Sequence, residues 1–361
     1  MRVAIIPSDK VACAHYRLAW PANAVAEQAG WSVEIHDPGD VTIHPPFMIK
    51  GIDDVEGLDL VVMQRIATPR QVRLVSAFQR LGIAVVVDVD DLMSDIETDN
   101  GSHKFWNEEF NGTPRYRLLE QATRVADLVT VSTPLLSRKY AKHGRVEVLR
   151  NGLPNKAYAN PDDVYNEHSK NPEEYVVGWS GSLASHPHDL EVLGGAVRRA
   201  MDTDARIRFH VVGEPEPVVQ ALNLDPSRVT GTGWLPFEEY HAALREIDLA
   251  LVPLKDSRFN RAKSHLKALE FSAAGAMVLT SPLPEQVHLA ENVPTGVAHT
   301  EQEWENVIVG ASALDEYVAE RMAHDRAEVV RSTVQWAFTN RAGEWVRAWQ
   351  RAIDRRKNLD K

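Results

Sequence analysis

The clearest structural unit in the chain is LDLVVMQRIATPRQVRLVSAFQRLGIAVVVDV, residues 58–89. Its two apolar runs, 58–64 and 83–89, lack the strict apolar–polar alternation of a half-exposed strand, so each predicts a strand buried on both faces. Between them, apolar residues in 69–81 recur at helical spacing. A helix between two such strands is typical of a βαβ unit with parallel strands.

The same pattern continues on both sides of this unit. Further apolar runs are VAIIP (3–7), ADLVTVST (126–133), VEVLRN (146–151), EYVVGWSGS (174–182), IRFHVVG (207–213), VTGTGW (229–234), IDLALVPL (247–254) and AMVLTS (276–281), and helical patterns cover 16–29 and 115–126. A segment rich in Asn, Pro and charged residues separates two series of runs, as expected of an interdomain connection. We therefore predict an α/β protein with two Rossmann-like, doubly wound domains that face a central cleft.

The predicted boundaries follow from where the pattern lapses and resumes. They give an N-terminal domain at 1–160, a linker at 161–174, a second domain at 175–335 and C-terminal helices at 336–361. In those last helices Trp345 and Trp349 are spaced i and i+4, so they share one helix face. We expect this face to pack back toward the first domain.

Composition narrows the class of protein. The chain has 361 residues, 44% apolar and 25% charged, which is ordinary for a folded protein. Its one cysteine, Cys13, excludes a disulfide framework and a cysteine metal cluster, and it suits a reducing compartment. No apolar run approaches the roughly 20 residues that span a bilayer, so we expect a cytoplasmic protein without membrane insertion.

The charge balance bears on the partner. The net charge is −11, which opposes binding to a polyanion such as DNA. Residues 115–150 nevertheless hold eight Lys and Arg against three Asp and Glu. This segment is either a local basic surface that binds an anionic partner or a solvated helix face.

The segment RFNRAKSHLKALEFSAAGAMVLTS, residues 258–281, carries the strongest chemical signal. Ser264 is the expected N-cap of its helix, yet Lys263 and Lys267 stand where cations oppose the helix dipole. A bound diphosphate would resolve this conflict, because backbone N–H groups and both lysines would converge on it. Glu270, two turns into the helix, either accepts from ribose hydroxyls or is surface charge.

Three other segments follow predicted strands. Gly181 and Ser182 permit close backbone approach, and Asp189 is near the next helix. His186 and His188 offer donors to a phosphate or a sugar, but their spacing gives little support for zinc.

Asp90 and Asp91 come directly after the strand at 83–89. Their carboxylates could ligate a cation, orient a sugar hydroxyl or cap a helix. We favour the interpretation in which both residues line the cleft and bind no metal. In SDKVACAHYRLAWPA (8–22), His15, Tyr16 and Arg17 could face the cleft or begin an ordinary helix. The chain has no Walker A sequence, nucleophile elbow or HExxH motif.

Taken together, these segments resemble the GT-B glycosyltransferases of family 4, particularly phage and bacterial members with a K-S-x-x-K-x-x-E pattern. That pattern is KSHLKALE, residues 263–270, here. ACAHYRLAWPA, VVVDVDDL and ADLVTVSTPLLSRKYAKHGRVEVLRNGL resemble the post-strand, double-Asp and last strand–helix elements of the first domain. The resemblance runs from residue 1 to about 285.

The resemblance implies transfer of a hexose from a nucleotide-diphosphate sugar, a UDP- or GDP-sugar, with retention at the anomeric carbon and with no metal or cofactor. It assigns catalysis to Asp90, Asp91, His186 and Lys263, donor binding to Gly181, Ser182, Asp189, Gly213, Gly233, Trp234, Leu235, Asn260, Ser264, Lys267 and Glu270, and the acceptor side to Tyr16 and Arg17. In a retaining reaction the departing phosphate accepts the acceptor's proton. An inverting reaction would need Asp90, Asp91 or His15 as general base.

One residue departs from the family pattern. Its members commonly carry two Glu separated by seven residues, and Glu270 matches the second, whereas Ala262 stands at the first. The stereochemical course and the sugar therefore stay open, as does the oligomeric state. The acceptor is a protein, a glycan or lipid-linked sugar, or a modified DNA base of a phage-type enzyme acting in its host's cytoplasm. Alternatives are an epimerase or phosphorylase of the same fold and a non-catalytic nucleotide-binding protein.

Overall fold

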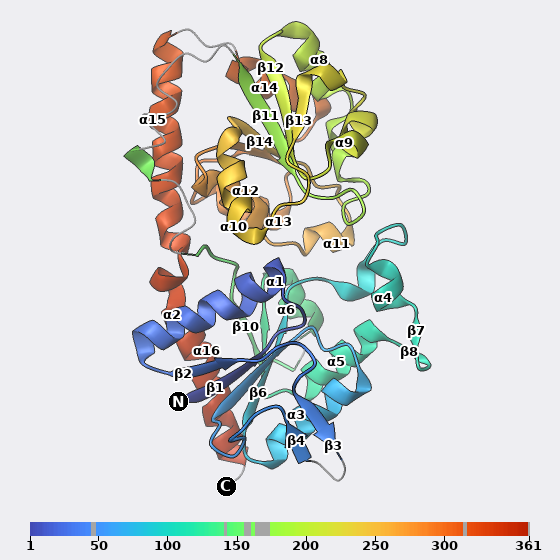
Figure 1. Cartoon of the computed structure of the whole chain (residues 1–361), viewed down its shortest axis with the longest axis vertical. Helices are drawn as coiled ribbons and strands as arrows, with labels where there is room; N and C mark the ends of the chain where they lie inside the picture. The colour runs from blue at the N-terminus through green and yellow to red at the C-terminus, as the bar shows by residue number, and fades with distance from the viewer. Residues whose placement is uncertain (45–47, 141–142, 155–159, 163–173, 313–315, 360–361) are drawn as a thin grey trace.

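The computed structural model describes residues 1–44, 48–140, 143–154, 160–162, 174–312 and 316–359. In this part of the chain, two sheets of six parallel strands lie one above the other (Figure 1). The predicted α/β class with two doubly wound, Rossmann-like units is confirmed. Most of the predicted linker at 161–174 lies outside the described residues.

In each sheet the most apolar strands lie in the middle. The first sheet runs β10 (Val146–Val148), β9 (Leu128–Val131), β6 (Ala84–Val89), β5 (Leu60–Gln64), β1 (Arg2–Ile6) and β2 (Ser32–Ile35). The second runs β13 (Val229–Gly231), β12 (Ile207–Val212), β11 (Tyr175–Ser180), β14 (Leu249–Val252), β15 (Met277–Thr280) and β16 (Gly296–Val297). Two antiparallel pairs, β3 (Thr42–His44) with β4 (Met48–Lys50) and β7 (Glu109–Phe110) with β8 (Thr113–Pro114), lie outside these sheets.

Helices connect and cover the strands. In the first domain they are α1 (Ala12–Ala14), the π-helix η1 (His15–Ala19), α2 (Trp20–Ala29), α3 (Pro69–Arg80), α4 (His103–Asn107), α5 (Arg115–Val125) and α6 (Pro134–Tyr140). In the second they are α8 (Ala196–Thr203), α9 (Pro215–Leu222), α10 (Phe237–Ala243), α11 (Arg258–Arg261), α12 (Leu266–Ala273), α13 (Pro284–Ala290), α14 (Glu301–Ser312) and α15 (Glu316–Thr333), and α16 (Phe338–Leu359) ends the chain. Short 3₁₀ turns are η2 (Met93–Asp95), η3 (Asp189–Leu193), η4 (Pro226–Arg228), η5 (Leu244–Glu246) and η6 (Val334–Trp336). None of the described helices is long and apolar enough to cross a membrane.

Each sheet separates two apolar cores because successive side chains of a strand point to opposite faces. On β1, Ala4 and Ile6 face the core beneath α3 and α5, whereas Val3 and Ile5 face α2 and α16. The second sheet has the same division. Burial on both faces is therefore the reason that these strands appear in the sequence as unbroken apolar runs.

The chain crosses between the domains twice. Leu153 forms a parallel bridge with Ala337, so the outgoing and returning segments lie side by side. After η6, α16 runs along the first domain beside α2 (Figure 1). Trp345 and Trp349 are each 1% exposed within the core that α2 and α16 share.

The periodicity revealed the edge strands β10 and β13 but missed the other two, β2 and β16. β2 has the exposed or half-exposed pattern of an edge strand over only four residues. Its sequence, SVEI, lacks the continuous apolar run on which the predicted strands were based.

Replacing Trp349 with alanine should lower the free energy of unfolding of the first domain by about 3–5 kcal/mol, because it removes a fully buried aromatic side chain and leaves a cavity. Urea denaturation monitored by circular dichroism measures the change. Arg347→Ala, on the exposed face of the same helix, is the control and should change stability by less than about 0.5 kcal/mol. Equal effects of the two substitutions would contradict this packing.

Candidate functional site

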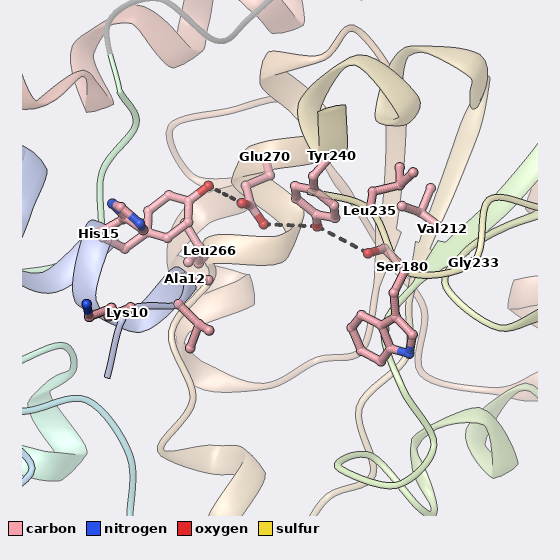
Figure 2. A pocket seen from close by; sticks show the side chains of 14 residues that line it. Lys10, Ala12, His15, Ser180, Val212, Gly233, Leu235, Tyr240, Leu266 and Glu270 are labelled. Carbon is pink, nitrogen blue, oxygen red and sulfur yellow. Dashed lines mark hydrogen bonds between the residues drawn. The ribbon is translucent and has the colours of Figure 1, made fainter. Parts of the chain in front are cut away.

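One cavity lies between the two domains at the carboxyl ends of their strands. It encloses about 490 Å³. The first domain contributes Lys10, Val11, Ala12, His15 and Tyr16, and the second contributes Ser180, Gly181, Val212, Gly233, Trp234, Leu235, Tyr240, Leu266 and Glu270 (Figure 2). Parallel α/β sheets bind ligands at this edge. Tyr16, Gly181, Gly233, Trp234, Leu235 and Glu270, which the sequence analysis selected, therefore line one space.

Glu270 connects the two sides of this cavity. The Tyr16 hydroxyl donates to Glu270 Oε1, and the Tyr240 hydroxyl lies 3.4 Å from Oε2. Tyr240 also lies 3.1 Å from the Ser180 hydroxyl oxygen (Figure 2). Glu270 is only 5% exposed, so the surface-charge reading of this residue is wrong.

Lys267 places a desolvated cation beside the end of β11. Burial lowers the pKa of Lys267 to about 8. Its Nζ lies 5.4 Å from the centre of the Trp179 ring, and it makes no hydrogen bond or ion pair within the described chain. Gly181 has a φ of +149°, and a Cβ there would come within 3.0 Å of Lys267 Nζ. Glycine at this strand end therefore keeps space around the ammonium.

His186 is held in one orientation next to this lysine. Its Nδ1 lies 2.7 Å from Asp189 Oδ2, and Asp189 Oδ1 accepts from the Asn260 amide at 2.7 Å and the Lys255 backbone N–H at 3.0 Å. Burial, followed by the charge of Lys267, lowers the pKa of His186 to about 4. Because an ionised Asp189 only accepts, the neutral ring carries its proton on Nδ1 and leaves Nε2 as an acceptor.

Asp90 and Asp91 follow β6 on the opposite side and are bound by cations. Arg65 Nε donates to Asp90 at 2.6 Å, and another Arg65 nitrogen lies 3.3 Å from Asp91. Lys263 Nζ lies 3.8 Å from Asp91 Oδ1. Burial raises the pKa of Asp91. For Asp90 burial is the largest single cause, but the charge and hydrogen bonds of Arg65, together with Arg17 and Cys13, outweigh it and lower the pKa.

Arg65 and Tyr240 are site residues that the sequence analysis missed. Arg65 directly follows β5, so the strand-end rule that selected Asp90 could have found it. Its positive φ of 45° is a strained conformation for a non-glycine residue. Tyr240, within α10, carries no comparable sequence signal.

Arg17 does not face the cleft, contrary to the expectation. It is 1% exposed, and its guanidinium donates to Asp88 at 2.8 and 3.1 Å. It also donates to the Leu149 carbonyl and to Asn151 Oδ1. A buried guanidinium needs such partners, so Arg17 is part of the core of the first domain.

Ser264 is not the N-cap of its helix either. Helix α12 begins at Leu266 with His265 at the cap position, and no side chain caps it. Ser264 Oγ instead accepts from Asn151 Nδ2 at 2.8 Å. Ala262, the departure from the family pattern, is fully buried, and its carbonyl accepts from the Thr133 hydroxyl of the first domain at 3.0 Å.

Two more selected residues lie just outside the cavity wall. A Cβ at Gly213 would lie 2.5 Å from the Gly181 carbonyl, so glycine there lets two strand ends pack closely. The Ser182 carbonyl accepts from the Ser185 and His186 backbone N–H groups. Both support the turn that carries His186.

One group in the described residues has the spacing of metal ligands, namely Glu97, Asp99 and His188. Both nitrogens of His188 already contact carboxylates, those of Asp99 and Glu191. His186 is not part of this group, so the two histidines do not form a pair. Among the described residues, no metal-ligand group includes Asp90 or Asp91.

Comparisons with known proteins identify the fold to which the two domains and their cleft belong. Residues 174–299 match the family model described as glycosyl transferases group 1. HepE of Anabaena, solved in complex with UDP and glucose, superposes with a TM-score of 0.60 at 14% identity over 96% of this chain and 98% of that one. The fold is GT-B.

Other solved structures share the GT-B arrangement. Sucrose-phosphate synthase of Thermosynechococcus elongatus has a TM-score of 0.57 at 17% identity, over 96% of this chain and 98% of its own. The N-terminal domain of Candida albicans trehalose-6-phosphate phosphatase has a TM-score of 0.56 at 12% identity, over 97% of each chain. No curated protein matches the sequence. At these identities the solved structures establish the fold alone.

Replacing Lys267 with methionine should stabilise the ligand-free GT-B protein by about 1–3 kcal/mol at pH 7, because the folded state holds a desolvated ammonium. The folded pKa of about 8 lies below the ordinary lysine value of 10.5, so the unfolded state binds more protons between these values. The cost of the wild-type lysine is therefore complete below pH 8 and fades toward pH 10.5. Urea unfolding at pH 7 and pH 9.5 measures the difference.

The matched control is Lys263→Met. Lys263 lies beside Asp91, so its removal leaves a carboxylate with one cation fewer and gives no such gain. If the Lys267→Met protein is no more stable than wild type at pH 7, burial does not destabilise the ammonium as its lowered pKa implies.

Proposed function

We propose that the chain is a glycosyltransferase that moves a hexose from a nucleotide-diphosphate sugar, UDP- or GDP-linked, to an acceptor hydroxyl. The observation that carries this proposal is Lys267 of α12, half-buried beside the end of β11 with a lowered pKa and with no hydrogen bond or ion pair to the described residues, within the region that matches the glycosyl transferases group 1 model. A buried cation without an ion pair is costly unless an anion joins it. The diphosphate is that anion.

The donor is proposed to extend along the second domain. Gly233, Trp234 and Leu235 line the end of the cavity for the base, and Glu270 accepts from the nucleotide's ribose. Gly181 and Lys267 hold the diphosphate, with Lys263 and Ser264 alongside. His186, fixed by Asp189 and Asn260, offers Nε2 to a hydroxyl of the sugar.

Catalysis is proposed to be electrostatic. As the bond to the sugar breaks, negative charge grows on the diphosphate, and Lys267 with Lys263 stabilises it in a site with little water. We propose retention, in which the departing phosphate takes the acceptor's proton. Asp90 and Asp91 orient the acceptor from the first domain.

We propose that the reaction needs no metal ion. Arg65 and Lys263 stand beside Asp90 and Asp91 where a divalent cation would otherwise neutralise these carboxylates. Adding EDTA should therefore change turnover by less than twofold, and a loss that Mg²⁺ or Mn²⁺ restores would contradict this. Proton NMR of the glycoside formed should show the donor's anomeric configuration, whereas the opposite configuration would mean inversion.

The acceptor is proposed to be a protein, a glycan or a modified DNA base, and the single cysteine suits action in the cytoplasm. Binding to duplex DNA with a steep salt dependence would favour the DNA base. Binding of a donor without any turnover would favour the non-catalytic alternative.

Slow hydrolysis of UDP-, GDP-, ADP-, dTDP- and CMP-sugars tests the proposal without knowledge of the acceptor. One donor should be turned over, and Lys267→Ala or Lys263→Ala should reduce its turnover by about 10²–10³-fold, the cost of removing one stabilising charge. Arg261→Ala is the charge-matched control, since its side chain is 55% exposed and pairs with Asp256. If no donor is turned over and no donor stabilises the protein against heat, the proposal is wrong.

A further inference from the structure

The two oxygens of Glu270 have unequal surroundings. Oε1 accepts from the Tyr16 hydroxyl and lies 3.7 Å from His241 Nε2, and that nitrogen is itself 2.9 Å from the Tyr16 hydroxyl. Oε2 has only a long contact, 3.4 Å, from Tyr240, whose hydroxyl also contacts Ser180. Oε1 is thus taken up by protein groups, and Oε2 is the oxygen with capacity to spare.

Tyr16 is fixed in this position. It is 2% exposed, and its ring packs edge to face against Trp20 at 4.6 Å between centres. The next residue, Arg17, is anchored by its buried pair with Asp88. Both belong to the π-helix η1, a conformation that often occurs at functional sites. Moving Tyr16 away from Glu270 would disturb all of these contacts.

We propose that Tyr16 sets the specificity of the donor site for the nucleotide's pentose: the site needs only one pentose hydroxyl and accepts 2′-deoxyribonucleoside diphosphates about as well as ribonucleoside diphosphates. This inference rests on the proposed function, because it takes Glu270 as the group that holds the pentose. A carboxylate with both oxygens open can accept from the two neighbouring hydroxyls of a ribose. Tyr16 already uses one lone pair of Oε1 and His241 Nε2 lies 3.7 Å from it, so Oε1 has less capacity for a second hydroxyl than Oε2 has, and a 2′-deoxyribose still supplies its 3′-hydroxyl.

The rest of the wall is consistent with this specificity. Near Glu270 the cavity is lined by Leu266 and Ala12, whose side chains offer no hydrogen bond to a second hydroxyl (Figure 2). The polar neighbour Tyr240 already contacts Glu270 Oε2 and the Ser180 hydroxyl. A missing 2′-hydroxyl would therefore leave no buried polar group unsatisfied. In a site that does bind that hydroxyl through a carboxylate, its loss typically weakens binding tenfold or more.

The test compares dissociation constants of matched pairs, UDP with dUDP and GDP with dGDP, by isothermal titration calorimetry on the full chain. For the pair that binds, the wild-type ratio should be below about threefold. Tyr16→Phe removes the hydroxyl from Oε1 and opens it to the ribose, so the variant should prefer the ribonucleotide by about tenfold or more. Tyr240→Phe is the matched control: it removes a hydroxyl from the other oxygen and should leave the ratio near one.

The outcomes separate this inference from the proposed function. A wild-type preference of tenfold or more for UDP over dUDP would overturn the role of Tyr16 while supporting a nucleotide site, and it would mean that Tyr16 yields Oε1 to the ligand. An unchanged ratio in a folded Tyr16→Phe protein would also overturn it. If neither member of either pair binds, the proposed function fails and this inference with it. Should Tyr16→Phe not fold, the wild-type ratio alone decides.

Discussion

The buried ion pair between Arg17 and Asp88 holds together the part of the first domain from which the contacts to the second domain extend. Its guanidinium donates to the carboxylate at the end of β6, to the Leu149 carbonyl and to Asn151. Thr130 of the neighbouring strand donates to the same carboxylate at 2.7 Å. Burial raises the pKa of Asp88, so the neighbouring guanidinium and hydroxyl are what keep the carboxylate a favourable charged partner. The pair therefore fixes a helix, two strands and the start of the interdomain connection to one another.

From that pair the structure extends into the cleft in two directions. Along the helix, the residue before Arg17 is Tyr16, which reaches Glu270 of the second domain. Along the chain, Asn151 donates to Ser264, next to Lys263. The same strand, β6, is followed directly by Asp90 and Asp91. One desolvated ion pair thus positions side chains on both sides of the proposed donor site, although it does not itself face the cavity.

In the second domain, the site contains buried ionisable groups whose desolvation lowers the stability of the ligand-free fold. His186 is neutral and Lys267 has a lowered pKa, and in both cases burial is the principal cause. Neither arrangement improves the ligand-free fold. Such groups gain from burial only when a ligand with complementary charge and hydroxyl groups joins them, which is why they favour a binding site over a structural network.

Predictability differed between fold and site for identifiable reasons. The parallel strands were predictable because burial on both faces leaves an unbroken apolar run, whereas β2, an edge strand, leaves none. Lys267 and Asp91 could be selected because each stands near the terminus of a predicted element. Arg17 could not be distinguished from a cleft residue, since its partner Asp88 is 71 positions away. Ser264 was assigned to a helix cap by local preference, but a hydrogen bond from Asn151, 113 positions away, takes its hydroxyl.

By itself, the sequence determined the α/β class, the two doubly wound domains and the residue types gathered at strand ends, because local periodicity and strand-end position are written along the chain. Only the tertiary structure decided which of those residues share the cavity, that Arg65 and Lys263 neutralise the aspartates, and that Tyr16 occupies one oxygen of Glu270. These facts depend on pairs such as Tyr16 and Glu270, 254 positions apart. Hydrogen bonds and ion pairs act over a few ångströms in space, so residues far apart in the sequence can form them. The local sequence pattern does not indicate which distant residues will be neighbours.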